Sequence, residues 1–228
     1  MKRLSLTLMS VFLLSPLAVA ETVKNCEHYD TLVAQYSITK SKLNHKQEVT
    51  NETSNQMTLL RDKNQVSHDY IGQPWVPTWR LLNSGHIAKT DFYPKQKQCI
   101  EYEPNKVKNS LHNWQEKFQL VADDSISEMK LVSRTGANCN ILEEYELHDG
   151  DSHIELQWWP KQNLMKHYNV ATSHGQQSWD LSNVELKTKK SKKVFKQYDD
   201  YTLTDYADIG DNETDPFLRS MIHLGFTH

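Results

Sequence analysis

Glycine and cysteine are scarce in this chain, which has 7 glycines and 3 cysteines among 228 residues. So few glycines leave little material for loops that cradle phosphate groups, and neither a P-loop nor a dinucleotide-binding fingerprint is present. There is no G-x-S-x-G nucleophile elbow, and no C-x-x-C pair that would indicate a thioredoxin-type role. We therefore expect no cofactor and no catalytic residues, with a hydrolase of unknown type as an alternative.

Long apolar runs are missing after the first twenty residues. Those twenty comprise a basic start, Lys2-Arg3, an apolar segment over 4–14, and Ala18-Val19-Ala20 before Glu21, which is the order of a secretory signal peptide. We expect cleavage after Ala20, a single β-rich domain over 21–228, and a periplasmic or secreted location. No later stretch approaches the roughly 20 apolar residues of a spanning helix, so no transmembrane segment is expected.

An excess of basic residues is also missing, since the formal net charge is −3. This balance argues against a general nucleic-acid binder. In an oxidising compartment, three cysteines favour one disulfide and one leftover thiol. Cys99 and Cys139 both lie beside predicted strands and are the preferred pair, although the sequence leaves pairing with Cys26 open.

Most of the chain has the pattern of short strands joined by polar turns. The clearest hairpin spans 141–159, where Asp149-Gly150 separates two runs of alternating apolar and polar residues. Its second strand should place Ile154, Leu156 and Trp158 on one face and His153, Glu155 and Gln157 on the other. Weaker turn signals predict three further strand pairs: 57–60 with 66–70, 79–82 with 87–93, and 164–170 with 178–186. Two more strands are expected, one over 99–102 and a last one over 194–198 or 201–203.

Three segments have helical spacing. They are an N-terminal helix over 27–36, a middle excursion over 111–129 that breaks near Asp123-Asp124, and a C-terminal helix that starts at Pro216 after the N-cap Asp215. Together the segments predict a β-rich α+β fold. Its sheet is a strongly curved antiparallel, half-barrel-like meander, accompanied by the N-terminal helix, the middle excursion and the short C-terminal helix.

Aromatic residues are frequent on the predicted strands. On the concave face of a curved sheet they could enclose an apolar ligand, and the alternative is that they only fill the core. The candidate ligand-binding residues are Trp79, Tyr102, Tyr145, Trp158, Tyr168 and Trp179.

The charge changes sign sharply near the C-terminus. Lysines at 187, 189, 190, 192 and 193 precede an acidic run. On a strand, alternate lysines would form a solvated edge. The alternative is contact with an anionic surface through Lys187, Lys189, Lys190, Lys192 and Lys193. In the acidic run, Asp208, Asp211 and Glu213 are candidates for docking a partner protein. The alternative is a calcium site at the same residues, which would be irregular because the spacing of an EF-hand loop is absent.

Eleven histidines raise the question of a metal. Four potential ligands gather at the tip of the 141–159 hairpin: His148, Asp149, Asp151 and His153. The chain has no H-E-x-x-H motif and no Cys/His pair at zinc spacing. We therefore expect no metal, with a weak exchangeable site at this tip as the alternative.

Three segments resemble a known superfamily in their pattern of strands: 57–66 (MTLLRDKNQV), 79–103, and 154–160 (IELQWWP). They cover about a fifth of the mature chain, and the layout is similar to the periplasmic half-barrels that include the lipoprotein carriers LolA and LolB and the regulator RseB. The closing segment over 205–217 departs from that pattern and suggests a separate family. The resemblance implies the half-barrel fold and, by analogy, binding of an acyl chain or a lipidated partner, and no functional residue is carried over.

The function expected from the sequence is that of an exported, non-catalytic protein that binds an apolar or lipid-like ligand, or a lipidated partner, on an aromatic-lined sheet face. The first alternative is a periplasmic interaction or sensor module that docks through its acidic C-terminal segment.

Overall fold

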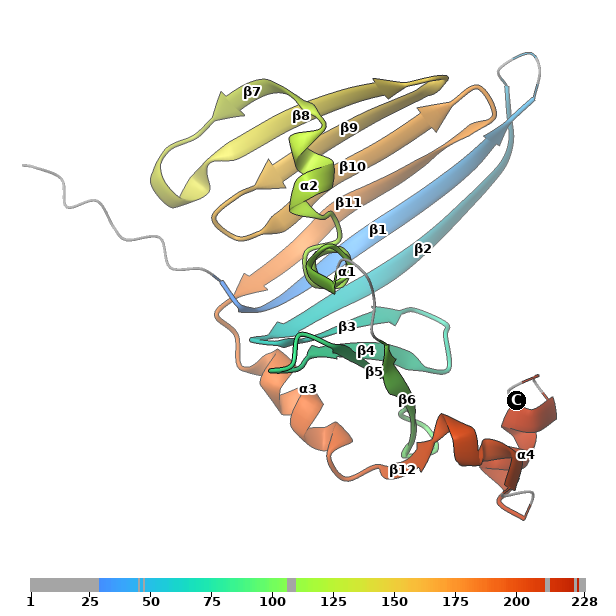
Figure 1. The fold of residues 1–228 in the computed structure, drawn as a ribbon. Helices are drawn as coiled ribbons and strands as arrows, with labels where there is room; N and C mark the ends of the chain where they lie inside the picture. The colour runs from blue at the N-terminus through green and yellow to red at the C-terminus, as the bar shows by residue number, and fades with distance from the viewer. Residues whose placement is uncertain are drawn as a thin grey trace, which may run out of the picture.

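Twelve strands form one open sheet in the computed structural model, which describes residues 29–44, 46, 48–105, 110–211, 214–223 and 225 (Figure 1). The order across the sheet is β12-β6-β5-β4-β3-β2-β1-β11-β10-β9-β8-β7, and neighbours are antiparallel except for the parallel pair β12 and β6. The bounds are β1 Thr31–Leu43, β2 Val49–Asp62, β3 Gln65–Tyr70, β4 Val76–Leu81, β5 Ile87–Tyr93, β6 Gln98–Asn105, β7 Lys130–Thr135, β8 Leu142–Asp149, β9 Ser152–Trp159, β10 Leu164–Thr172, β11 Gly175–Leu186 and β12 Thr202–Asp205. The β-rich α+β fold predicted from the sequence is confirmed.

The predicted hairpins are all present. β8 and β9 pair with His148 opposite His153 and Tyr145 opposite Leu156, so the two faces of β9 carry the residues expected from the alternation. β2 pairs with β3, β4 with β5, and β10 with β11 around the turns that the sequence indicated. Gly150 has a φ of 59°, a left-handed conformation that glycine adopts without steric cost, which explains its place in the β8–β9 turn.

The predicted N-terminal helix is wrong, because residues 31–43 form β1. The apolar residues Leu32, Val33 and Tyr36 fit helical spacing, but Ala34 and Ile38 continue an alternation in which every second side chain is buried. β1 is central in the sheet, pairing with β2 on one side and β11 on the other. Burial of one of its faces in the core favours the strand over the helix. Residues 27 and 28 lie outside the described residues.

The middle and C-terminal helices are present. The middle excursion consists of α1 (Ser110–Phe118) and α2 (Asp123–Ser127), and it breaks just before Asp123. The C-terminal helix is α4 (Pro216–His223), where Asp215 Oδ1 accepts hydrogen bonds from the backbone N–H of Phe217 at 2.7 Å and of Leu218 at 3.1 Å. This is the N-cap expected from the sequence.

The lysine run does not form a strand edge, because residues 190–198 form helix α3 (Lys190–Tyr198). Ser191, Phe195 and Tyr198 are buried along one side of this helix and the lysines between them are exposed. The last strand is instead β12, close to the alternative predicted over 201–203.

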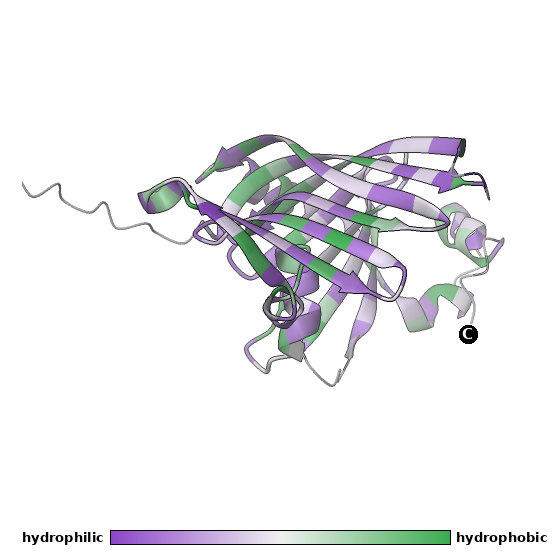
Figure 2. Cartoon of the chain, turned by 90° about the horizontal axis from the view of Figure 1, so that it is seen from above, coloured by the Kyte–Doolittle hydropathy of each residue, from purple (hydrophilic) through white to green (hydrophobic). Residues whose placement is uncertain are grey.

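The two faces of the sheet have different coverings. We call inner the face that carries Leu32, Ala34, Tyr36 and Ile38 of β1, all buried, and outer the face that carries Val33 and Gln35. Trp114, Val121 and Ile126 of the α1–α2 segment pack on the inner face. The 3-10 helix η2 (Tyr206–Asp211) and α4 pack beside β5 and β6, whereas α3 covers the outer face of β2, β5 and β6. Hydrophobic and hydrophilic residues alternate along the strands in Figure 2.

The predicted Cys99–Cys139 disulfide is wrong. Cys99 is a free, buried cysteine on β6, packed between Leu60, Phe92 and Phe195, whereas Cys139 is disulfide-bonded. Cys139 lies in the 3-10 helix η1 (Asn138–Asn140), directly before β8 and near the opposite end of the sheet order from β6. The third cysteine, Cys26, lies outside the described residues.

Candidate ligand-binding site

The six aromatic residues expected to bind a ligand share the inner face. Four successive strands align Tyr145, Leu156, Tyr168 and Trp179 in one cross-strand row that continues to Ile38 of β1. Trp158 lies on the same face of β9, and Trp79 and Tyr102 reach that face through the register of β3 to β6. Alternation within each strand and the register between strands together place these side chains on a common face.

Only two of the six line the same pocket. Tyr168 and Trp179 do so, while Trp158 is 4% exposed and belongs to the filled core. The Tyr145 hydroxyl donates to Glu143 at 2.8 Å. The other two lie elsewhere: Trp79 is tilted against His68, and Tyr102 donates to Asp91 and stacks on Tyr206.

The pocket lies between α1 and the inner face and has a volume of about 310 Å³. That volume is at the lower end of the range for small-molecule sites, roughly 300–1,000 Å³. Its lining combines the aromatic and apolar residues Tyr70, Leu120, Met165, Tyr168 and Trp179 with the polar residues His68, Glu116 and Lys117, and polar atoms form at least as much of its surface as apolar atoms. The pocket is therefore an open cleft with both apolar and polar surface.

Sequence reasoning missed most of this lining. His68 and Tyr70 continue the alternation of Val66 on a predicted strand, so their shared face could have been recognised. Leu120 follows α1 with a φ of 74°, a conformation rare for leucine, and no local signal places it over the sheet. The packing of α1 against β3 and β10 is a tertiary contact that no single segment encodes.

Beneath α1 the inner face holds a buried guanidinium. Arg61 is fully buried and donates to the carbonyl oxygens of Asn163 at 2.9 Å and Gln162 at 3.0 Å, which ties β2 to the β9–β10 turn. Phe118 of α1 covers the guanidinium at 4.7 Å. Burial lowers the Arg61 pKa to about 10, so the group remains charged at neutral pH.

His68 forms the link between the sheet and α1. Its Nε2 lies 2.7 Å from the carbonyl oxygen of Lys117, and because a carbonyl only accepts, this nitrogen carries the hydrogen. Burial lowers the pKa of His68 to about 4, which keeps the ring neutral at physiological pH. A neutral ring that donates to the last turn of α1 therefore holds the helix over the pocket.

The α1 and α2 helices are also joined to each other. His112 contacts the Asp124 carboxylate at 2.7 Å, and Asp123 accepts from the side-chain amides of Gln115 and Gln119, both at 2.6 Å. The hydrogen bond to Asp124 raises the pKa of His112. These bonds make α1 and α2 one unit that covers the inner face.

The acidic docking candidates lie away from the pocket. Asp208 and Asp211 are exposed on η2, which follows β12 and is anchored by the buried Ile209. Glu213 lies outside the described residues.

The candidate lysines gather where β11 leads into α3. Lys187, Lys189 and Lys192 line a shallow pocket of about 390 Å³ together with Lys63 and the carboxylates of Asp30 and Asp62. Lys190 forms an ion pair with Glu185, and Lys193 is exposed on α3. The lysines thus form a mixed-charge patch rather than a purely basic one.

Comparisons with known proteins give only distant likeness. No known protein family and no curated protein matches the sequence. Among solved structures, PNGF-II aligns with a TM-score of 0.37 and 7% identity, over 75% of this chain and 31% of its own. An outer membrane lipoprotein-sorting protein domain from Vibrio parahaemolyticus aligns with a TM-score of 0.31 and 7% identity, over 76% of this chain and 94% of its own. This chain therefore spans less than a third of PNGF-II. Among the described residues, every helix is too short or too polar to cross a membrane.

Proposed function

We propose that this protein is an exported, non-catalytic binder of a lipid-like ligand, a free acyl chain or one attached to a partner protein. The observation that supports the proposal is the pocket between α1 and the inner face, whose walls are formed by Tyr70, Leu120, Met165, Tyr168 and Trp179. Burial of an acyl chain there would contribute roughly 0.8 kcal/mol per CH₂ group. Export follows from the signal-peptide pattern over residues 1–20.

A charged end of the ligand would meet Lys117. Its Nζ lies 5.5 Å from the centre of the Trp79 ring, whereas Glu116 is engaged by His112 at 3.3 Å. An anionic head group, carboxylate or phosphate, therefore fits this side of the pocket better than a cationic one. The lysines near the start of α3 would add long-range attraction to anionic surfaces, and this attraction should weaken with salt.

Tryptophan quenching by a brominated fatty acid tests the proposal. Trp179 is the tryptophan that lines the pocket, while Trp75 packs beside Tyr93 near α4. We expect saturable quenching in the wild-type protein, retained in Trp75→Phe and largely lost in Trp179→Phe. Palmitate without bromine should reverse the quenching by competition.

Quenching that persists in Trp179→Phe would place the fatty acid elsewhere on the protein. Absence of saturable quenching in the wild type would contradict lipid binding altogether. Lys117→Gln should weaken binding of the fatty acid more than binding of the corresponding alcohol, because only the acid carries the charge that Lys117 attracts.

A further inference from the structure

Two histidines and a glutamate meet on the outer face, near the tip of the β8–β9 hairpin. Glu146 and His148 are two residues apart on β8, so both side chains point to the same face. His153 is the cross-strand partner of His148, because the turn pairs Asp149 with Ser152. The hairpin register alone therefore brings the three side chains together.

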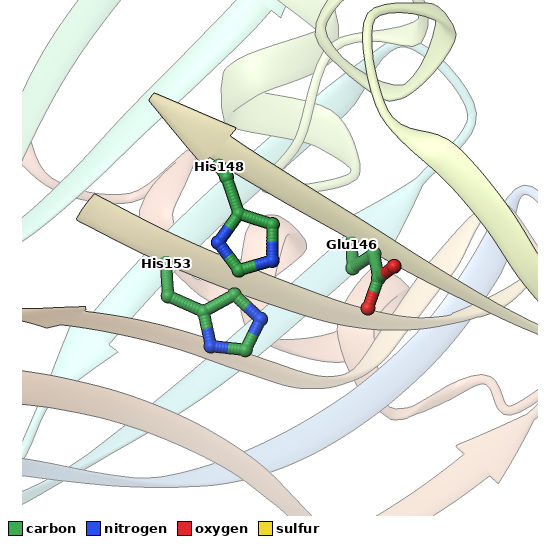
Figure 3. Close-up of side chains that lie close together, drawn as sticks. All are labelled: Glu146, His148 and His153. Carbon is green, nitrogen blue, oxygen red and sulfur yellow. The ribbon is translucent and has the colours of Figure 1, made fainter. Parts of the chain in front are cut away.

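The three groups lie close enough together to share a single ion. The imidazole rings of His148 and His153 stack with their centres 4.3 Å apart and 2° between their planes. One donor atom from each of the three residues lies within 4.8 Å of the other two, and Figure 3 shows the Glu146 carboxylate beside the two stacked rings. Donors that bind one tetrahedral zinc at about 2.0–2.2 Å are roughly 3.4 Å apart. The donors must therefore move closer, and the two stacked rings must tilt toward each other, before they bind one ion.

A second observation concerns one of the ring nitrogens of this cluster. The Nε2 atom of His153 is buried and has no hydrogen-bond partner among the described residues. A buried polar atom without a partner costs free energy and is rare in folded proteins. In addition, Glu146 stands directly opposite Glu155 across the β8–β9 pair, and facing like charges are destabilising. A bound cation would relieve both costs.

We propose that Glu146, His148 and His153 bind a divalent transition-metal ion of the zinc class, with the fourth coordination position left to water or to an external ligand. Two imidazole nitrogens and one carboxylate oxygen favour zinc-like ions over calcium or magnesium, which prefer all-oxygen sites. Three protein ligands with one open position is also the arrangement of exchangeable and catalytic zinc sites rather than of closed structural ones.

The surroundings favour cation uptake. Glu146 also lines a pocket of about 280 Å³ together with Glu144 and Glu155, so the local field is negative. The competing cation, Lys130, lies 3.4 Å from Glu146 in a pair whose lysine is largely exposed. Exposed pairs of this kind contribute little free energy, and a divalent ion would displace Lys130.

Calorimetric titration of ZnCl₂ into the metal-stripped mature protein tests the site. We expect one zinc ion per chain in the wild type. His148→Ala and His153→Ala should each weaken binding at least about tenfold, since loss of even a supporting group around a metal costs 10–100-fold. Glu146→Gln, which keeps the shape and removes the charge, should weaken binding as well.

His174→Ala is the matched control, because His174 is an exposed histidine at the neighbouring β10–β11 tip, outside the cluster. Its zinc affinity should equal that of the wild type, and circular dichroism should show that all variants fold. Zinc affinity that is unchanged in the His148→Ala/His153→Ala double variant would overturn the proposal, as would the absence of saturable binding in the wild type. Neither result bears on the pocket of the inner face, which is tested by fatty-acid quenching.

Discussion

The β8–β9 hairpin carries different chemistry on its two faces. On the inner face, Leu156 and Trp158 are buried in the core that also packs under α1 and α2. On the outer face, Glu155 and His148 are exposed and His153 is half-buried. Strand residues alternate between the faces with a period of two, so adjacent positions in the sequence serve separate surfaces.

The two faces of one sheet therefore favour different types of site. A pocket for an apolar ligand needs a covering element, and the α1–α2 unit supplies it on the inner face. A metal site needs converging donors with access to solvent, and the outer face supplies these through hairpin register alone. Substitutions on the inner face should therefore affect stability and lipid binding, and those on the outer face should affect metal binding.

Alanine substitutions at two adjacent residues of β9 should give the largest difference in the free energy of unfolding. Trp158→Ala removes a buried aromatic side chain and should lower the free energy of unfolding by about 3–5 kcal/mol. Gln157→Ala, one residue away on the outer face, removes a half-buried side chain that donates to Glu144 at 3.0 Å and should lower it by only about 1 kcal/mol. Urea unfolding measures both, and equal effects would contradict the division between the faces.

Removal of the buried guanidinium should have the next largest effect. Arg61→Ala leaves the carbonyl oxygens of Gln162 and Asn163 without their donors and opens a cavity under Phe118, for a loss of roughly 3 kcal/mol. Arg80, exposed on β4, offers the control, and Arg80→Ala should be close to neutral in the same unfolding experiment.

Acid should destabilise the inner face through His68. Burial lowers the pKa of this ring to about 4, and an unfolded histidine titrates near about 6.5, so the unfolded state takes up a proton first. The contribution of the neutral His68 ring to the free energy of unfolding is fully present above about pH 6.5. It is lost as the pH falls toward about 4, and the loss amounts to at most about 3 kcal/mol. His68→Gln should flatten this pH dependence of unfolding, and His167→Gln on the outer face should leave it in place.

Zinc should stabilise the fold modestly through the outer face. Binding to the native state alone adds about 1.4 kcal/mol when free zinc is ten times the Kd. Thermal unfolding should shift upward in the wild type and in His174→Ala, and the shift in His153→Ala should correspond to about 0.4 kcal/mol or less, since tenfold weaker binding brings free zinc to the Kd. An equal shift in all three proteins would mean that zinc stabilises the fold through some other residues.

Local signals predicted most of the sheet and little of the pocket. Asp149-Gly150 and the alternation of Ile154, Leu156 and Trp158 determine a hairpin without help from the rest of the chain. β1 was misassigned because its apolar residues fit two periods, and burial between β2 and β11 selects the strand. In α3 the spacing of Ser191, Phe195 and Tyr198 carries a helical signal that the lysines between them obscured.

The hairpin cluster and the pocket also differ in how far local sequence signals predict them. The sequence suggested the hairpin-tip histidines as a weak alternative, and strand alternation could have added Glu146 to them. The pocket forms between α1, which packs against β3, and residues of β10 and β11, and these segments are distant from one another in the sequence, so only Tyr168 and Trp179 of its lining are predicted.

The most direct test of lipid binding is a native mass spectrum of the mature protein, expressed with its own signal peptide and compared with a denatured spectrum. We expect extra mass in the range of a fatty acid or phospholipid that is released on denaturation and is absent from a Trp179→Ala/Tyr168→Ala variant that remains folded. A bare polypeptide mass, both as purified and after incubation with palmitate, would contradict it.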